Sequence, residues 1–144
     1  MKSLIVDDDF NNLIILQKAL ERFGPIHHAE DGKQAVESVR IALKTGRPFD
    51  LICLDIMMPK MDGQEALKEI RTLEEEMGIT SENQAKIIML TALADRENVV
   101  KAIRQKCSSY LIKPIDIGKL HQELHKLGLI GQQKSEETQL INDD

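Results

Sequence analysis

Acidic side chains gather directly after two short apolar runs of the sequence. Asp7, Asp8 and Asp9 follow residues 4–6, and Asp55 follows residues 51–54. Runs of this kind, rich in Ile, Leu and Val, are typical of strands buried inside a parallel sheet. Carboxylates held a few ångströms apart repel one another unless a cation lies between them. If the two strand ends are neighbours, these acids call for a divalent metal ion, a lysine, or both.

The sequence can supply the groups that would complete such a site. One or two carboxylates with water are the ligands that Mg²⁺ prefers, and Mg²⁺ usually shares its site with a phosphoryl group. Thr91 and Lys113 each close a later apolar run. If those runs join the same sheet, a hydroxyl and an ammonium face the carboxylates. We therefore expect a site that could surround a phosphoryl group.

Each of these residues also has an ordinary structural explanation. An Asp after a strand often caps the following helix, and this explains Asp9 equally well. Lys113 could be a solvated residue that Pro114 holds extended. Asp55 is harder to explain in this way, because residues 56–59 separate it from the next helix, which follows the Pro59–Gly63 turn. A lone acid at the end of an apolar strand needs a partner.

The elements that must position these residues alternate along the chain. Apolar residues at spacings of three and four follow each short apolar run and predict amphipathic helices. Strict alternation implies a parallel sheet with helices on both faces, because each crossover connection is right-handed. In the strand order 2-1-3-4-5, the ends of the first and third strands meet where the order reverses, so Asp7, Asp8 and Asp55 converge there. The predicted strands are residues 4–6, 26–29, 51–54, 87–90 and 110–112.

Composition narrows the class of protein. The chain has 144 residues, with 19 Lys and Arg against 24 Asp and Glu, and its only aromatic residues are one Tyr and three Phe. This balance argues against a nucleic-acid surface. No apolar run approaches the roughly 18 residues of a membrane span, and no cleavable leader is evident. We expect a cytoplasmic protein with no direct contact to nucleic acid or membrane.

The chain divides into one domain and a tail. The helical pattern fails after residue 127, and residues 128–144 contain one Lys against four acids. We therefore predict a domain over 1–127 and an acidic, flexible tail over 128–144. The acidic run Glu74–Glu76 is expected to be the solvated end of the third helix.

Four segments of the sequence match a known family. They are LIVDD at 4–8, LDIMMPKMDG at 54–63, MLTA at 89–92 and YLIKP at 110–114. With these segments in order over residues 1–127, the chain resembles the chemotaxis-type receiver domain of two-component response regulators. The resemblance implies a flavodoxin-like doubly wound (βα)5 fold. The order 2-1-3-4-5 is that of chemotaxis receivers themselves, so it is part of the resemblance.

The resemblance also implies how the acidic site works. Asp55 would be the phospho-acceptor, receiving its phosphoryl group from the phosphohistidine of a sensor histidine kinase or phosphotransfer protein. Mg²⁺ would be the cofactor, bound by Asp8, Asp55 and the backbone carbonyl of Met57, and by Asp7 mainly through water. No other cofactor is implied.

Further residues of the resemblance belong to the switch. Lys113 would pair with the phosphoryl oxygens, aimed by a cis bond to Pro114. Thr91 would bond a phosphoryl oxygen, and Tyr110 would rotate into the space that the Thr91 loop leaves. The fourth helix, fifth strand and fifth helix would then form the output surface.

Two departures from the family pattern carry expectations of their own. Many receivers have Gly-Ala where this chain has Lys106-Cys107, so the end of the fourth helix lacks its usual left-handed glycine. Met57 and Leu93 are apolar at positions that influence the access of water to the phosphoryl group. We therefore expect the phosphorylated form to be long-lived.

We interpret the sequence as a stand-alone receiver, a phospho-acceptor switch that catalyses only its own phosphorylation and dephosphorylation and is not otherwise an enzyme. A receiver fragment of a larger hybrid kinase or regulator, and a pseudo-receiver that acts as a binding module, remain alternatives. A flavodoxin-like redox protein would need a phosphate loop where Asp7, Asp8 and Asp9 stand. A phosphatase with an aspartyl-phosphate intermediate would need an acid at position 57, where the chain has Met57.

Overall fold

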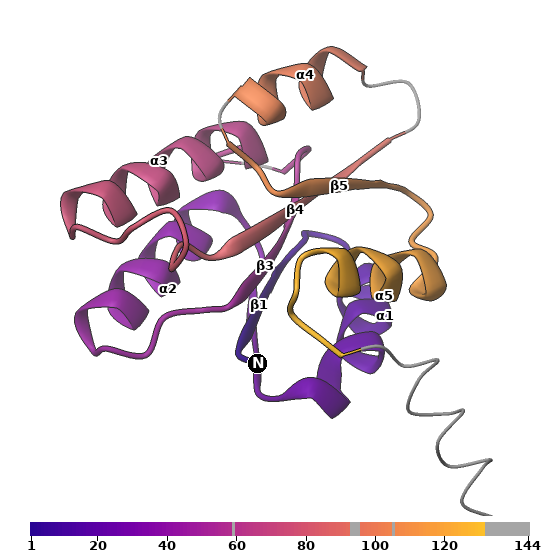
Figure 1. The fold of residues 1–144 in the computed structure, drawn as a ribbon. Helices are drawn as coiled ribbons and strands as arrows, with labels where there is room; N and C mark the ends of the chain where they lie inside the picture. The colour runs from indigo at the N-terminus through magenta and orange to yellow at the C-terminus, as the bar shows by residue number, and fades with distance from the viewer. Residues whose placement is uncertain (59, 93–95, 105, 132–144) are drawn as a thin grey trace, which may run out of the picture.

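The fold is a five-stranded sheet between two layers of helices. The computed structural model describes residues 1–131 except 59, 93–95 and 105 (Figure 1). All four strand pairings are parallel, and the order is β2-β1-β3-β4-β5, so the predicted fold is confirmed. The strands are β1 Ser3–Val6, β2 Ile26–Ala29, β3 Leu51–Asp55, β4 Lys86–Thr91 and β5 Ser109–Ile112.

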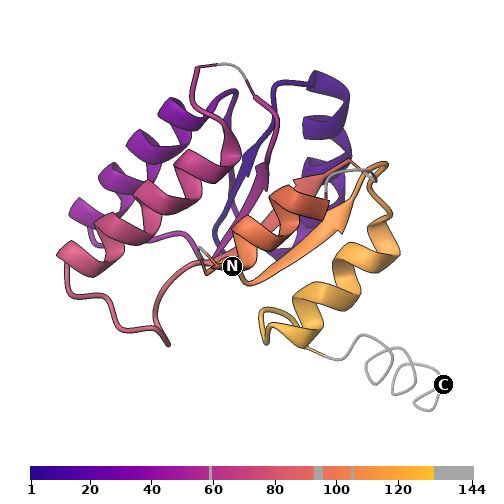
Figure 2. The same cartoon turned by 90° about the horizontal axis from the view of Figure 1, so that it is seen from above.

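Helices cover both faces of this sheet. Helices α1 and α5 lie together on one face, and α2, α3 and α4 lie on the other (Figures 1 and 2). None of the helices in the described ranges is long and apolar enough to cross a membrane. The helices are α1 Phe10–Leu20, followed by the 3-10 turn η1 Glu21–Phe23, then α2 Gly32–Lys44, α3 Gly63–Glu76, α4 Arg96–Arg104 and α5 Ile117–Lys126.

Alternating side chains of the strands feed two hydrophobic cores. In β1, Leu4 and Val6 pack toward α2 and α3, whereas Ile5 packs toward α1 and α5. The central strands are buried on both faces, which explains why their sequences are continuously apolar and do not alternate. A fully buried sheet of this kind holds its strand ends rigidly, and this rigidity is what a site built on those ends requires.

Aspartates begin four of the helices. The side chains of Asp9, Asp31, Asp62 and Asp116 each accept a hydrogen bond from a backbone N–H in the first turn of α1, α2, α3 and α5. These caps satisfy donors that the helix itself cannot satisfy. Asp9 is therefore a helix cap, which was one of its two sequence interpretations.

Two sequence expectations about helix ends need attention. The prediction that Glu74 is solvated is wrong, because Glu74 is 2% exposed and pairs with the buried Arg71. The end of α4 does lack a glycine at its left-handed position, since Lys106 occupies it with φ 69°. Arg71 connects the two residues, because its guanidinium donates to both Glu74 and the Lys106 carbonyl.

The chain continues past α5 in contact with the domain. Gly128 adopts φ 75°, and the Leu129 N–H donates to the Leu124 carbonyl, 2.9 Å away. Leu129 and Ile130 then pack against the α1–α5 core. Residues 132–144 lie outside the described residues, and a flexible acidic tail stays a prediction.

Candidate functional site

Three carboxylates meet at the carboxyl ends of β1 and β3. The two strands pair in parallel with Val6 opposite Leu54, so Asp7 and Asp55 follow side by side. One oxygen each of Asp7, Asp8 and Asp55 lies within 4.8 Å of the others. Asp7 and Asp55 are buried, whereas Asp8 is exposed. The cluster is thus shielded from solvent at Asp7 and Asp55 and open to solvent at Asp8.

Lys113 reaches this cluster from β5. Its Nζ lies 3.1 Å from Asp7 Oδ2 and 3.1 Å from Asp55 Oδ1. The backbone N–H of Lys113 donates to the Thr91 carbonyl at 2.8 Å, which fixes the lysine at the end of β4, and the Lys113–Pro114 peptide bond is cis. The ammonium therefore bridges the two buried carboxylates.

Backbone N–H groups also hold the two buried carboxylates in place. The Asp9 N–H donates to Asp7 Oδ1 at 2.9 Å, and the Met57 N–H donates to Asp55 Oδ1 at 3.3 Å. Asp7 Oδ2 is buried and accepts no hydrogen bond within the part of the chain that the structure describes, so the Lys113 ammonium is its partner. A buried carboxylate oxygen with unfilled lone pairs is suited to a cation.

Burial and neighbouring charges shift the titration of the site. Burial raises the pKa of Asp55 to about 6; the Asp7 charge raises it as well, whereas Lys113 and the Met57 N–H lower it. Burial lowers the pKa of Lys113, but the carboxylates of Asp55 and Asp7 outweigh this effect and leave that pKa raised. When the three carboxylates of the cluster are ionised, the single Lys113 ammonium leaves the site with a net negative charge.

These observations fit a hard divalent cation such as Mg²⁺. The donors are carboxylate oxygens, the ligand type that Mg²⁺ prefers. Asp8 is exposed and can be reached from solvent, while the buried Asp7 Oδ2 has, among the described residues, only the Lys113 ammonium as its partner. The Met57 backbone lies against Asp55 through its N–H bond, so its carbonyl is close in the chain to the same cluster.

Thr91 and Tyr110 lie on the neighbouring strands. Thr91 is buried at the end of β4, one residue beyond Leu90, which pairs with Asp55. Its hydroxyl donates to the Ala92 carbonyl at 3.3 Å and not to the carboxylates. Tyr110 is 42% exposed on β5. Leu93, the second apolar position of the sequence analysis, lies outside the described residues.

Gly63 supports the site in a way that the sequence interpretation missed. Its N–H donates to the Ile56 carbonyl at 2.8 Å, and a Cβ at this position would lie 2.2 Å from the Asp55 carbonyl oxygen. Because no side chain fits there, α3 begins directly against the backbone at the end of β3. The sequence interpretation places Gly63 only at the end of the turn before this helix; the glycine inside the LDIMMPKMDG segment is the available signal.

Comparison with known proteins agrees with this geometry. The model of the response regulator receiver domain matches residues 3–125. The transcriptional regulatory protein ZraR of Escherichia coli O157:H7 is 36% identical over 124 residues, which are 85% of this chain and 25% of ZraR. The chain thus spans about a quarter of the length of this relative.

Shorter relatives match along nearly their whole length. The chemotaxis protein CheY of Bacillus subtilis is 34% identical over 125 residues, covering 85% of this chain and 93% of CheY. A crystal structure of the CheX–CheY–BeF₃–Mg²⁺ complex of Borrelia burgdorferi superposes with a TM-score of 0.76 at 27% identity, covering 90% of each chain. Together with the acidic cluster, these matches show that the chain belongs to the response regulator receiver domains of two-component phosphorelay signalling.

Proposed function

We propose that the chain is a phospho-acceptor switch in which Asp55 accepts a phosphoryl group from the phosphohistidine of a histidine kinase or phosphotransfer protein. The observation that carries the proposal is the Lys113 ammonium, 3.1 Å from both the Asp55 and the Asp7 carboxylates. A lone buried acid could be a structural accident. A buried acid bridged by a lysine to a second acid, beside an exposed third, is a site prepared for added charge.

The transfer follows from the position of Asp55. A carboxylate oxygen of Asp55 forms a bond to phosphorus while the phosphorus–nitrogen bond of phosphohistidine breaks. The departing imidazole keeps the electron pair of that bond and takes up a proton. Lys113 is already placed beside Asp55 and neutralises the charge of the phosphoryl oxygens. Asp55 must be ionised to attack, and its pKa of about 6 leaves it mostly ionised at neutral pH.

A metal ion would be held by the remaining donors of the site. Asp7, Asp8, Asp55 and the backbone carbonyl of Met57 would bind Mg²⁺, which when bound neutralises charge on the phosphoryl oxygens. Asp8 is the member of this set that solvent reaches freely. We propose that Asp7 contributes mainly through water, as its buried position behind Lys113 suggests.

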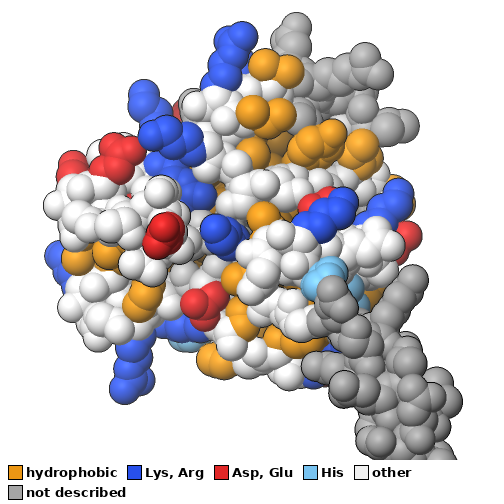
Figure 3. Space-filling view, in the orientation of Figure 1, with side chains coloured by type: hydrophobic (Ala, Val, Ile, Leu, Met, Phe, Trp, Pro, Cys, Tyr) orange, Lys and Arg blue, Asp and Glu red, His pale blue; other side chains and the backbone are white. Residues whose placement is uncertain are grey.

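Phosphorylation would act on partners through the far edge of the sheet. Phosphoryl contacts to Thr91 and Lys113 exist only in the phosphorylated form, so they favour one of two arrangements. Exposed apolar side chains gather over α4 and β5 (Figure 3), where a partner could cover them. This output surface consists of Val100 and Ile103 on α4, Tyr110 and Ile112 on β5, and Ile117 on α5.

The length of the relatives supports a second arrangement for the same chemistry. ZraR is about four times as long as the matched region, so a receiver carried by a longer regulator is an alternative to a stand-alone switch. The acceptor step is the same in both. A pseudo-receiver that only binds partners differs from both, because it would not become phosphorylated.

Intact mass spectrometry tests the proposal directly. The chain is incubated with Mg²⁺ and a small acyl phosphate, and we expect the mass of one phosphoryl group on the wild type and none on Asp55→Asn. Asp9→Asn is the matched control, because it makes the same chemical change beside the cluster and asparagine still caps α1. An unmodified wild type in the presence of Mg²⁺ would reduce the protein to a binding module.

A further inference from the structure

A buried ion pair on the α3–α4 side of the sheet takes no part in the acceptor chemistry. Arg71 is 6% exposed and Glu74 2%, and Arg71 Nη1 lies 2.6 Å from Glu74 Oε1. Burying two charges is unfavourable unless each is fully hydrogen-bonded. The chain also carries an ion pair of the same type and spacing, Arg40 with Glu37 on α2, that stays exposed. The buried pair therefore needs an explanation beyond helix stability.

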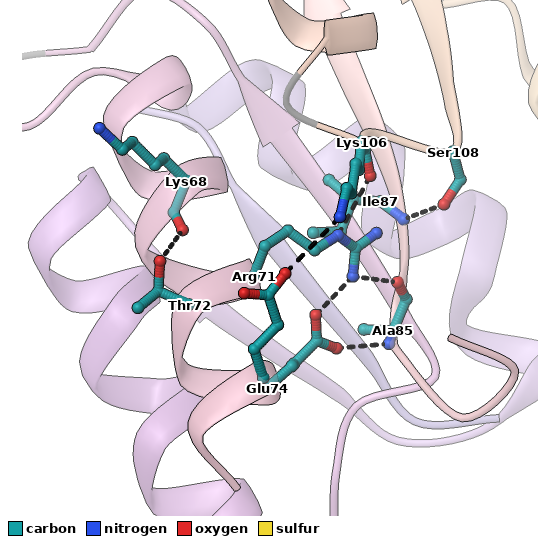
Figure 4. A network of polar contacts seen from close by, with 9 residues as sticks. Lys68, Arg71, Thr72, Glu74, Ala85, Ile87, Lys106 and Ser108 are labelled. Atoms are coloured by element: carbon teal, nitrogen blue, oxygen red, sulfur yellow. Dashed lines mark hydrogen bonds and ion pairs between the residues drawn. The ribbon is translucent and has the colours of Figure 1, made fainter. Parts of the chain in front are cut away.

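The pair connects three segments that are far apart in the sequence (Figure 4). Glu74 accepts from the Ala85 N–H at 2.7 Å, and Arg71 donates to the Ala85 carbonyl at 2.9 Å. The Arg71 Nε donates to the Lys106 carbonyl at 3.1 Å. Helix α3 is thereby fixed both to the start of β4 and to the loop that follows α4.

The contact at Lys106 lies where α4 ends. Lys106 has φ 69°, a left-handed conformation that a non-glycine residue adopts only at a cost in free energy. The Lys106 and Cys107 N–H groups close the end of α4 on the Ile103 and Ala102 carbonyls. From α3, the exposed Glu75 pairs with the Lys106 ammonium at 3.6 Å, and the Arg71 guanidinium holds the carbonyl of the strained residue itself.

Helix α4 has few other attachments in the part that the structure describes. Of its side chains from residue 100 to 104, Ala102 is buried and the other four are exposed. Beyond α4, the Ser108 N–H donates to the Ile87 carbonyl and its Oγ accepts from the Ile87 N–H, which ties the chain back to β4. The C-terminal end of α4 is thus fixed by hydrogen bonds to α3 and β4, whereas most of the described side chains of α4 face solvent.

We propose that Arg71 and Glu74 form a clamp that fixes the C-terminal end of α4, which makes Arg71 a positioning residue for the α4 part of the output surface. The clamp sets where Val100 and Ile103 are presented, and α4 moves about this fixed end when the acceptor site changes state. The geometric role stands on the contacts above; its use in signalling rests on the proposed function.

Arg71→Lys tests whether the hydrogen bonds of the clamp matter, apart from the positive charge of Arg71. Lysine keeps the positive charge beside Glu74, but one ammonium cannot reproduce the fork of bonds to Glu74, Ala85 and Lys106. Glu74→Gln is the second variant, because it removes the buried charge and keeps an acceptor for the Ala85 N–H. The matched control is Arg40→Lys, in the exposed pair of α2.

Hydrogen exchange measured by mass spectrometry on the full chain, with no phosphodonor, tests the clamp alone. We expect peptides covering residues 100–108 to exchange at least tenfold faster in Arg71→Lys, with peptides of α1 and α2 unchanged. Arg40→Lys should leave residues 100–108 as in the wild type. Unchanged exchange at 100–108 in both Arg71→Lys and Glu74→Gln, or an equal rise in every helix, would overturn the clamp.

A second arm adds Mg²⁺ and a small acyl phosphate. In the wild type we expect the phosphorylation-dependent change in exchange to lie within α4 and to spare residues 106–108, and in Arg71→Lys we expect it to extend into them. The same extent of change in both proteins would overturn the role of the clamp in signalling. If the wild type takes up no phosphoryl group, the proposed function fails, but the result of the first arm still stands.

Discussion

The Lys113 ammonium lies 3.1 Å from Asp55 Oδ1, the same distance that separates it from Asp7 Oδ2. One positive charge is therefore shared by two buried carboxylates, with the exposed Asp8 beside them. The pKa of Asp55 rises to about 6 in spite of the lysine, because burial and then the Asp7 charge outweigh it. The site thus favours the binding of a further positive charge. In the absence of such a charge, the ionised Asp55 carboxylate destabilises the fold.

Replacing Asp55 with asparagine should stabilise the metal-free protein at neutral pH. The pKa of Asp55 in the folded chain lies above its ordinary value of 3.8, so its stabilising contribution is present below pH 3.8 and is lost as the pH rises through about 6. We expect Asp55→Asn to gain about 1–2 kcal/mol at pH 7.5, and less at pH 5. Urea unfolding in EDTA at both pH values measures this difference; a gain that grows toward acid pH would contradict it.

Substitutions of the neighbouring Asp8 and Asp9 should affect different properties, Mg²⁺ affinity in the first case and stability in the second. Asp8 is an exposed member of the carboxylate cluster, so Asp8→Ala should weaken Mg²⁺ binding at least tenfold and change stability by less than about 0.5 kcal/mol. Asp9 caps α1 through the Asn11 N–H, so Asp9→Ala should cost about 1 kcal/mol and leave Mg²⁺ affinity nearly unchanged. Calorimetric Mg²⁺ titration and urea unfolding separate the two effects. Equal Mg²⁺ affinity in Asp8→Ala and wild type would exclude Asp8 as a ligand.

A methyl group at Gly63 should disturb the site from below. The added Cβ would lie 2.2 Å from the Asp55 carbonyl oxygen and 2.7 Å from the Ile56 Cα, so backbone must move. We expect Gly63→Ala to lower the free energy of unfolding by about 1–3 kcal/mol. It should also weaken Mg²⁺ binding, because the strand end that carries Asp55 shifts. Gly118→Ala in α5 is the control. There the nearest contact is the Asp116 side chain at 3.2 Å, so we expect little loss or a small gain in stability.

Much of the site could be predicted because it depends on strand order and register. Once β1 and β3 are neighbours and parallel, pairing Val6 with Leu54 forces Asp7 and Asp55 together, and no detail of side-chain packing can prevent it. Helix starts also depend on the local sequence, because Asp31 and Asp62 cap α2 and α3 through hydrogen bonds to N–H groups three residues away. Helix caps and sheet topology can therefore both be predicted from the sequence.

The Arg71–Glu74 pair shows where such prediction ends. Within α3 the two residues are three positions apart and look like an ordinary surface pair. Their burial is decided by Ala85 and Lys106, which lie 11 or more residues away in sequence and contribute only backbone atoms to the pair. Backbone partners leave no trace in residue types. At Lys106 the missing glycine could be expected from the sequence, but the Arg71 bond that holds its carbonyl could not.

The side chain at position 57 should control how long the phosphoryl group lasts. Met57 is 64% exposed two residues beyond Asp55, and its thioether offers an attacking water no strong acceptor. We expect the wild-type phosphorylated form to outlast minutes and Met57→Gln to hydrolyse roughly tenfold faster, because an amide oxygen can orient that water. Met77→Gln, exposed at the far end of α3, is the control. Loss of the phosphorylated mass after donor removal gives the rate, and a wild-type half-life of seconds would contradict the expectation.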